Sequence, residues 1–313
     1  MKIFRTLEEI KDIKNAVVTT GSFDGVHVGH KVIINRLNKL AKDINGESVL
    51  ITFHPHPRRV LYPQTQGKDL LLINSQQEKI ELLRKAGLDN LIIIDFTLDF
   101  AQTTSLDFVN NILINKIHAK KIVVGFNHFF GHNREGNYDF LHELAFDHGF
   151  DVEEIPEQDI QNESVSSTKI RKALHDGDIQ RANAYLDHQY IMIGKLTPGS
   201  EMCYKLGLPT MSIFIDEDIK LIPPEGVYAI SLNCKDQYYR GMLNIRKACT
   251  KYQPLHPDIC IDIHLFDFDG DLIDETACVL FHKRIRELIN FRDSEHMRIQ
   301  LTKDKVMIDE LIY

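Results

Sequence analysis

The sequence has no long apolar run, and its first residues are too charged for an export signal. Hydrophobic residues make up 43% of its 313 positions and charged residues 26%, which is ordinary for a globular protein. No stretch approaches the roughly 18 apolar residues that a membrane span needs, and residues 1–15 lack the apolar centre of a secretory signal. We therefore expect a cytoplasmic protein of two domains with no part in a membrane.

Excess positive charge and paired cysteines are missing as well. The formal net charge of −8 at pH 7 argues against nucleic-acid binding, so a phosphate ligand has to be held by local donors. All five cysteines lie in the second half without a C-x-x-C pair, and the histidines have no third and fourth ligand at a recognisable spacing. We expect free thiols, no transition metal and small-molecule partners, while the oligomeric state stays open.

The first half alternates continuous apolar runs with stretches of helical spacing. The predicted strands are residues 16–20, 48–53, 91–95, 121–124 and 152–155; the predicted helices are residues 31–42, 76–86, 106–116, 138–148 and 167–177. Such alternation predicts a doubly wound parallel sheet. Ligands of these sheets bind beyond the carboxyl ends of the strands.

The second half changes to short alternating runs with turn signals. Residues 228–233 and 238–245 are predicted to pair as one hairpin, and residues 261–268 and 276–282 as another. This pattern predicts a small antiparallel barrel or sandwich, with a closing helix within residues 293–312. We place the domain boundary near Asp187, between domains 1–186 and 187–313.

Residues 21–30 read G-S-F-D-G-V-H-V-G-H between a predicted strand and a predicted helix. Gly21 and Gly25 let the backbone turn sharply, and the start of a helix offers free N–H groups to an anion. His27 and His30 can face that anion and stabilise charge on a transferring phosphoryl group. An isolated H-x-G-H is more often a structural histidine pair, so these residues alone leave both interpretations open.

The longer pattern G-x-F-D-G-x-H-x-G-H resembles the signature of the nucleotidyltransferases, and specifically of the bifunctional flavokinase and FAD synthetase family. The resemblance extends over nearly the whole chain. It implies ATP binding for adenylyl transfer by Gly21, Phe23, Asp24, Gly25, His27 and His30.

Two further stretches match the nucleotide site of this family. Residues 165–171 (V-S-S-T-K-I-R) resemble I-S-S-T-x-I-R, and residues 124–131 resemble V-G-x-[DN]-F-x-F-G with His128 in place of the usual Phe. Hydroxyls at a helix start and an arginine one turn later can converge on a triphosphate, although alone they are an ordinary cap beside a solvated arginine. The implied nucleotide-binding residues are Asn127, Ser166, Ser167, Thr168 and Arg171.

Residues 53–58 (F-H-P-H-P-R) end a predicted strand with a stiff loop. They resemble the F-x-P-H-P loop that the family places beside the flavin, which implies flavin binding by Phe53, Pro55, His56 and Pro57. Without the resemblance the loop is a rigid turn with cationic and aromatic surface.

The resemblance implies direct displacement in domain 1–186, an FMN adenylyltransferase. The FMN phosphate attacks the α-phosphorus of ATP, pyrophosphate leaves, and His27, His30, Arg171 and Mg²⁺ stabilise the charge. No protein nucleophile is required.

Domain 187–313 resembles riboflavin kinase, with departures. Residues 206–212 (L-G-L-P-T-M-S) match L-G-F-P-T-A-N, which implies that Thr210 and Ser212 hold Mg²⁺ and the ATP phosphates. Asp262 replaces the Glu that the family is proposed to use as general base. Residues 244–251 (N-I-R-K-A-C-T-K) depart from N-I-G-x-R-P-T-F at four positions.

Three functions are compatible with these observations. The first is synthesis of FMN and then FAD from riboflavin and ATP, which we favour because Thr210 and a carboxylate at Asp262 remain. The second is FMN adenylylation only, with a barrel that binds flavin or supports the first domain. The third, a nucleotidyltransferase for another phosphorylated metabolite, is disfavoured by the F-x-P-H-P loop and the barrel motif.

Overall fold

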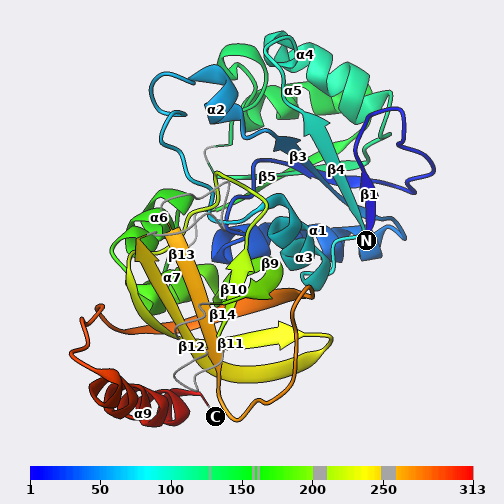
Figure 1. The fold of residues 1–313 in the computed structure, drawn as a ribbon. Coiled ribbons are helices and arrows are strands. Elements are labelled where there is room, and N and C mark those ends of the chain that lie inside the picture. Colours follow the sequence, from blue (N-terminus) through cyan, green and yellow to red (C-terminus); the bar gives the residue numbers. More distant parts are fainter. Residues whose placement is uncertain (127, 157–158, 161–162, 200–209, 248–258, 313) are drawn as a thin grey trace. The chain divides into compact units, whose positions relative to one another are not determined.

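The structure is a computed structural model and describes residues 1–126, 128–156, 159–160, 163–199, 210–247 and 259–312. It contains two compact units, which we call unit 1 and unit 2 (Figure 1). Unit 1 consists of Met1–Leu70 and Lys79–Val165; unit 2 consists of Leu71–Glu78 and Ser166–Tyr313. Among the described residues no helix is long and apolar enough to cross a membrane.

Unit 1 is built on a parallel sheet that confirms the predicted fold class. The strand order is β1 (Lys2–Phe4), β4 (Asn90–Asp95), β3 (Ser48–His54), β2 (Val17–Thr20), β5 (Lys121–Gly125), β6 (Asp151–Ile155). The strands β3 and β4 follow on one side of β2, and β5 and β6 lie on the other. The switch point, where ligands bind in such sheets, therefore lies between β2 and β5.

Apolar side chains cover both faces of this sheet, as a doubly wound fold requires. Val49 and Ile51 of β3 belong to one core cluster, and the intervening Leu50 belongs to the other. The helices α1 (Val28–Asp43) and α3 (Gln76–Lys85) bury side chains in the cluster that contains Leu50. The other cluster takes side chains from α5 (Tyr138–His148).

The helix predicted at residues 106–116 differs from the structure. A short α4 (Ser105–Asp107) runs into a π-helix, η2 (Phe108–Ile114), in which wider turns bury four side chains. Periodicity does not distinguish these two helix types, because both place apolar residues on one side. The prediction also missed β1, α2 (Pro57–Leu61) and α7 (Ile179–Leu186), all of which are short.

Unit 2 contains a closed antiparallel barrel, which confirms the predicted second architecture. The strand order is β10 (Met211–Phe214), β13 (Ile259–Leu265), β12 (Gln237–Lys247), β11 (Gly226–Cys234), β14 (Thr276–Arg286), β9 (Tyr190–Pro198). The buried Phe281 ring contacts the buried rings of Tyr190 and Tyr228. The closing helix α9 (Ser294–Leu311) packs Ile308 against Val227 and Met242.

One predicted hairpin of the barrel is confirmed and the other is wrong. β11 and β12 pair up to Cys234 opposite Gln237, and Lys235 and Asp236 between them both have positive φ, as a two-residue turn needs. β13 and β14 do not pair, because β14 lies between β11 and β9. Alternating side chains indicate strands, but barrel closure decides their neighbours.

Two helices before Asp187 pack with the barrel. They are α6 (Ser167–His175) and α7, and Asn183 of α7 is the clearest link. Its Nδ2 donates to the Phe281 carbonyl at 2.8 Å, and its Oδ1 accepts from the Tyr190 N–H at 2.7 Å. This packing division is distinct from the predicted functional boundary near Asp187, which stays a prediction.

The segment Leu71–Glu78 also belongs to unit 2, although residues on both sides of it belong to unit 1. The Leu72 N–H donates to the Ile219 carbonyl at 2.7 Å, and the Leu221 N–H donates to the Leu72 carbonyl at 2.8 Å. Backbone pairing thus attaches this segment to the stretch that follows β10.

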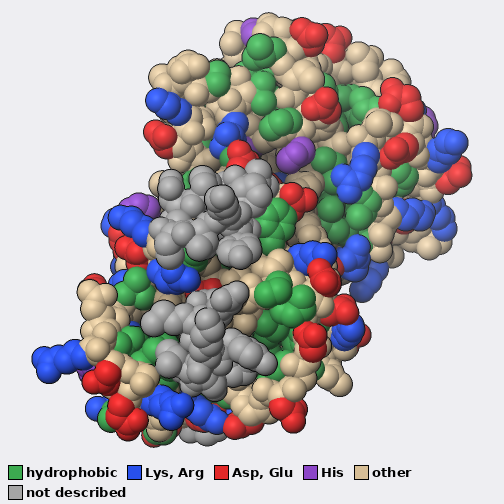
Figure 2. Space-filling view, viewed as in Figure 1, with side chains coloured by type: hydrophobic (Ala, Val, Ile, Leu, Met, Phe, Trp, Pro, Cys, Tyr) green, Lys and Arg blue, Asp and Glu red, His purple; other side chains and the backbone are tan. Residues whose placement is uncertain are grey.

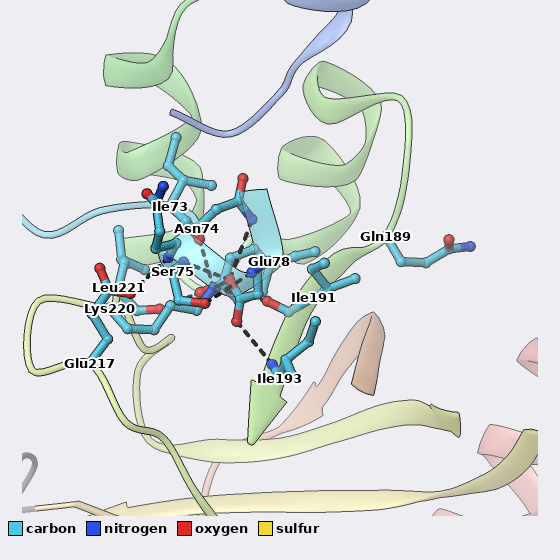
Figure 3. A network of polar contacts seen from close by, with 12 residues as sticks. Ile73, Asn74, Ser75, Glu78, Gln189, Ile191, Ile193, Glu217, Lys220 and Leu221 are labelled. Atoms are coloured by element: carbon cyan, nitrogen blue, oxygen red, sulfur yellow. Dashed lines mark hydrogen bonds and ion pairs between the residues drawn. The ribbon is translucent and has the colours of Figure 1, made fainter. Parts of the chain in front are cut away.

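A buried ion pair between Glu78 and Lys220 completes this attachment (Figure 3). Both side chains are 0% exposed. Lys220 Nζ donates to Glu78 Oε2 at 2.5 Å and to the Ile73 and Ile191 carbonyls at 2.7 and 2.9 Å. The Ile193 N–H donates to Glu78 Oε1. The pair is therefore satisfied by further hydrogen bonds, which a buried pair needs.

Glu78 also forms a capping box with Ser75 at the start of α3. The Ser75 N–H donates to Glu78 Oε2 at 2.9 Å, and the Glu78 N–H donates to Ser75 Oγ at 3.2 Å. The same carboxylate therefore caps a helix and neutralises a buried lysine.

Candidate active sites

A cavity of about 360 Å³ lies in unit 1 at the carboxyl ends of β2, β5 and β6. This is the switch point of the sheet. The wall includes residues of the G-S-F-D-G loop, the first turn of α1 and the turn after β5. Among them are Thr20, Gly21, Phe23, His27, His30 and His128.

The imidazoles of His27 and His30 stack in this cavity, with ring centroids 3.7 Å apart. Phe23 stacks on His30 at 4.4 Å. Burial, followed by the nearby His27 and Lys79, holds the pKa of His30 well below its usual range. The neutral state is thus favoured without an anion, and a bound phosphate would favour the protonated, donating state.

The start of α1 adds backbone donors to the histidines. His27 is the N-cap residue, with extended backbone (φ −71°, ψ 176°), so the N–H groups of the first turn begin at Val28. A side chain at Gly29 would press on the His27 ring, since a Cβ there would lie 3.3 Å from it. The helix start and the histidine pair together form an anion site.

Polar atoms of the cavity wall are buried without a partner among the described residues. They are Thr20 Oγ1, His30 Nδ1 and His128 Nε2. Leaving a buried polar atom unpaired costs about 1–3 kcal/mol. The arrangement is therefore suited to a polar ligand that would satisfy these atoms.

The loop after β2 is held in an unusual conformation. Phe23 and Val26 have φ of 47° and 42°, which is a strained region for residues other than glycine, and Gly25 has φ of 94°. Phe23, Val26 and Asp24 are buried, which helps to hold the turn. Asp24 and Gly25 shape this turn rather than line the cavity.

Lys79 holds the same loop, and the sequence analysis did not find it. Its ammonium donates to the Ser22 carbonyl at 2.8 Å, and the residue is 4% exposed. Thr20 was missed as well. The sequence signal for Lys79 is a charged residue on the buried side of a predicted helix, which is too common to be specific.

His128 lines the cavity where the family has Phe. Burial, with the nearby Arg134 cation, lowers the pKa of its imidazole to about 4. The ring is therefore neutral at physiological pH. Asn127, the preceding predicted residue, lies outside the described residues.

The predicted triphosphate residues of α6 lie in unit 2. Ser166 caps the helix, because its Oγ accepts from the Lys169 N–H at 3.4 Å, and Arg171 Nε donates to the Leu71 carbonyl at 2.8 Å. Val165, which directly precedes Ser166, lines the cavity of unit 1. Convergence of Ser166, Ser167, Thr168 and Arg171 with the two histidines stays a prediction.

The predicted flavin loop follows β3 and leads into α2. The Phe53 ring packs against Phe96 and Phe100 at centroid distances of 5.5 and 6.0 Å. His56 caps α2 by accepting from the Arg58 N–H, and Pro57 is its first residue. The flavin role of Phe53, Pro55, His56 and Pro57 stays a prediction.

The candidate kinase site spans three neighbouring barrel strands. Ser212 of β10 and Asn244 of β12 both lie directly opposite Asp262 of β13, so their side chains share one face. Ser212 Oγ donates to Asp262 Oδ1 at 2.8 Å. Arg246 donates to Asp262 Oδ2 from Nε at 3.1 Å and from Nη2 at 3.0 Å.

The oxygens at this site fit a magnesium ion. Thr210 Oγ1 and Asn244 Oδ1 are buried without a partner among the described residues, and Ser212 contributes a hydroxyl oxygen. Mg²⁺ prefers such hard oxygen donors, together with substrate phosphates. Asn244 was not among the predicted site residues, although the match to N-I at residues 244–245 was a signal for it.

The fold and these sites define a class of protein: a doubly wound α/β unit with a candidate anion site at its switch point, in one chain with an oxygen-rich antiparallel barrel. Comparison with known families agrees with it. A sequence model of the FAD synthetase family matches residues 9–169, and one of the riboflavin kinase family matches residues 186–312.

Curated relatives match almost the whole chain. A protein of Buchnera aphidicola (subsp. Schizaphis graminum) is 32% identical over 307 residues, covering 97% of this chain and 96% of its own. One of Listeria monocytogenes is 30% identical, covering 96% and 93%. Both are named bifunctional riboflavin kinase/FMN adenylyltransferase. The chain belongs to this family.

A solved structure from Streptococcus pneumoniae, described as a macrolide-efflux protein, has the same fold. Its TM-score is 0.86 at 28% identity, and the match covers 98% of both chains.

Proposed function

We propose that this protein converts riboflavin to FMN and then FMN to FAD, and that it uses ATP in both steps. The observation that carries the proposal is the histidine pair at the start of α1, stacked in the cavity of unit 1 beside buried polar atoms that have no partner among the described residues. The family membership supports both activities.

Adenylyl transfer takes place at the cavity of unit 1. An oxygen of the FMN phosphate attacks the α-phosphorus of ATP, and the bond to the bridging oxygen of pyrophosphate breaks. His27, His30 and the first N–H groups of α1 donate to the oxygens on which charge increases. We assign Asn127, Ser166, Ser167, Thr168 and Arg171 to the nucleotide, as the family motifs imply.

Riboflavin phosphorylation takes place on the barrel. Asp262 accepts the proton of the ribityl hydroxyl as that oxygen attacks the γ-phosphorus of ATP. Thr210, Ser212 and Asn244 would hold Mg²⁺, which supplies positive charge to the phosphates when bound. The flavin loop at Phe53, Pro55, His56 and Pro57 serves the adenylyl-transfer step.

We further propose a cytoplasmic location and no nucleic-acid partner. On the face drawn in Figure 2, and among the described residues, Lys and Arg are interspersed with Asp and Glu rather than gathered into one basic surface. The substrates are riboflavin, FMN and ATP. Residues 1–186 would carry adenylyl transfer and residues 187–313 the kinase.

One experiment tests both steps. Purified protein is incubated with ATP, Mg²⁺ and either riboflavin or FMN, and FMN and FAD are separated by chromatography. We expect FAD from FMN, and both products from riboflavin. Failure to form FAD from FMN would contradict the adenylyltransferase.

A second candidate, adenylyl transfer alone, is favoured by one observation. Arg246, which stands where the family motif has Gly, contacts the proposed base Asp262. In that case FMN would yield FAD and riboflavin would yield nothing.

A further inference from the structure

Asp262 is held from two sides by residues of neighbouring strands. Ser212 donates to one carboxylate oxygen and Arg246 donates twice to the other. The Asp262 side chain is 9% exposed and that of Arg246 29%. The pair is therefore mostly shielded from water, unlike a surface salt bridge of negligible effect.

The two carboxylate oxygens of Asp262 differ in how many further hydrogen bonds each can accept. A carboxylate oxygen has about two lone-pair sites. Both guanidinium N–H groups point at Oδ2, so this oxygen has no acceptor site left. Among the described residues, Oδ1 accepts from Ser212 alone and so keeps one acceptor site. The contacts thus select the oxygen that can receive a proton.

Arg246 and Asp262 are both departures from the family motifs. The motif has Gly where this chain has Arg246, and Glu where it has Asp262. Asp is one methylene shorter and holds its carboxylate closer to the strand. The planar guanidinium can fix the orientation of that carboxylate through paired N–H groups.

We infer, on the basis of the proposed kinase function, that Arg246 is a positioning residue for riboflavin phosphorylation. It occupies Oδ2 of Asp262 and so presents Oδ1, beside the Ser212 hydroxyl, to the substrate. Oδ1 accepts the proton of the ribityl hydroxyl while that oxygen bonds to the γ-phosphorus. The bond from the γ-phosphorus to the bridging oxygen breaks, ADP leaves, and the proton passes from Asp262 to solvent.

Steady-state kinetics of the full chain with riboflavin, ATP and Mg²⁺ test this role. We expect Arg246→Ala to lower kcat for flavin phosphorylation about 10- to 100-fold through misplacement of the base. The KM for riboflavin should change less than about threefold, because Arg246 acts through Asp262 rather than on the flavin. Arg246→Lys should restore part of kcat.

Two controls separate positioning from a general loss of structure. Lys247→Ala removes the same charge from the next residue, whose side chain points to the other face of β12, and should leave kcat within about twofold. Added guanidinium chloride at millimolar concentration should rescue Arg246→Ala, whereas urea, of the same shape without the charge, should not. Urea unfolding of each variant reports whether the barrel is folded, and FAD formation from supplied FMN reports that unit 1 is intact.

The outcomes distinguish this inference from the proposed function. If the wild-type protein forms no FMN from riboflavin but forms FAD from FMN, the kinase assignment fails and the inference falls with it. If the wild type is an active kinase and Arg246→Ala keeps or gains kcat, the kinase stands and the positioning role is refuted. Equal rescue by urea and guanidinium would also refute it.

Discussion

The cavity of unit 1 and the candidate kinase site of the barrel differ in how their polar atoms are paired. In unit 1, Thr20 Oγ1, His30 Nδ1 and His128 Nε2 have no partner among the described residues. In the barrel, Ser212 and Arg246 both contact Asp262. The first site offers donors directly to an anion, whereas the second orients its base through neighbouring side chains.

The motifs of the two sites also differ in how closely they match the family pattern. The G-x-F-D-G-x-H-x-G-H pattern is unaltered, and its Phe23, His27 and His30 line the cavity. The kinase motifs carry substitutions, and two of the substituted residues, Arg246 and Asp262, contact each other. Substitutions that pair with one another are typical of a rebuilt site.

The largest effect is expected when the buried Glu78–Lys220 ion pair of unit 2 is broken. Lys220→Met leaves the Glu78 carboxylate buried without its cation, which should cost about 3–5 kcal/mol in the free energy of unfolding. Urea unfolding of the full chain measures it. The double variant Lys220→Met/Glu78→Gln should lose less, because no uncompensated charge remains. A loss below about 1 kcal/mol for Lys220→Met would show that the pair contributes little.

Next in size is the loss of a donor from the cavity. His30→Ala should slow FAD formation from FMN and ATP roughly 10²- to 10³-fold, the usual effect of removing a donor that stabilises transition-state charge. FMN formation from riboflavin is the internal control, since its residues lie in the barrel. An unchanged rate of FAD formation would remove His30 from the site.

A conservative change at the proposed kinase base is expected to have a smaller effect than His30→Ala. Asp262→Glu should lower the rate of FMN formation up to about 100-fold, because the longer side chain moves its carboxylate about 1 Å from the contacts with Ser212 and Arg246. Asp262→Asn should abolish FMN formation and leave FAD formation from FMN intact. A faster Asp262→Glu enzyme would instead indicate a site that still fits the Glu of the family.

The smallest expected effect concerns pH. Burial lowers the pKa of His128 to about 4, so the unfolded chain binds a proton there more readily than the folded one. The contribution of neutral His128 to the free energy of unfolding is therefore fully present above the ordinary pKa of histidine and is lost as pH falls. From about pH 7 to pH 5.5 this amounts to about 1 kcal/mol.

Urea unfolding at the two pH values, with His128→Phe as the matched variant, measures this contribution. His128→Phe should reduce the loss on acidification without abolishing it, because the pKa of His30 is lowered in the same direction. An identical loss in the variant would mean that His128 does not titrate in this way.

Local patterns predicted most elements of both units. The apolar run of β3, the spacing of α1 and the closing helix α9 were visible in the sequence. These features depend on residues a few positions apart, so periodicity and capping chemistry report them directly. The phosphate-site prediction at residues 21–30 has the same local origin.

The sequence predicted the site residues that belong to a recognisable motif and missed those that do not. Phe23, His27 and His30 share one motif and lie in one cavity. Lys79, which holds the Ser22 carbonyl, comes from a distant helix and belongs to no motif. Arg246 was visible as a departure from the family, but a departure does not say what the new side chain contacts.

By itself, then, the sequence determined most of the strands and helices, the glycine and histidine loop and the family, since each depends on short-range pattern. Tertiary structure alone decided that β14 neighbours β9 and β11, that Leu71–Glu78 packs with the barrel, and that Arg246 meets Asp262. The physical reason is that strand partners and buried ion pairs join residues far apart in the chain. Their choice depends on barrel closure and on burial of whole surfaces, which no local pattern encodes.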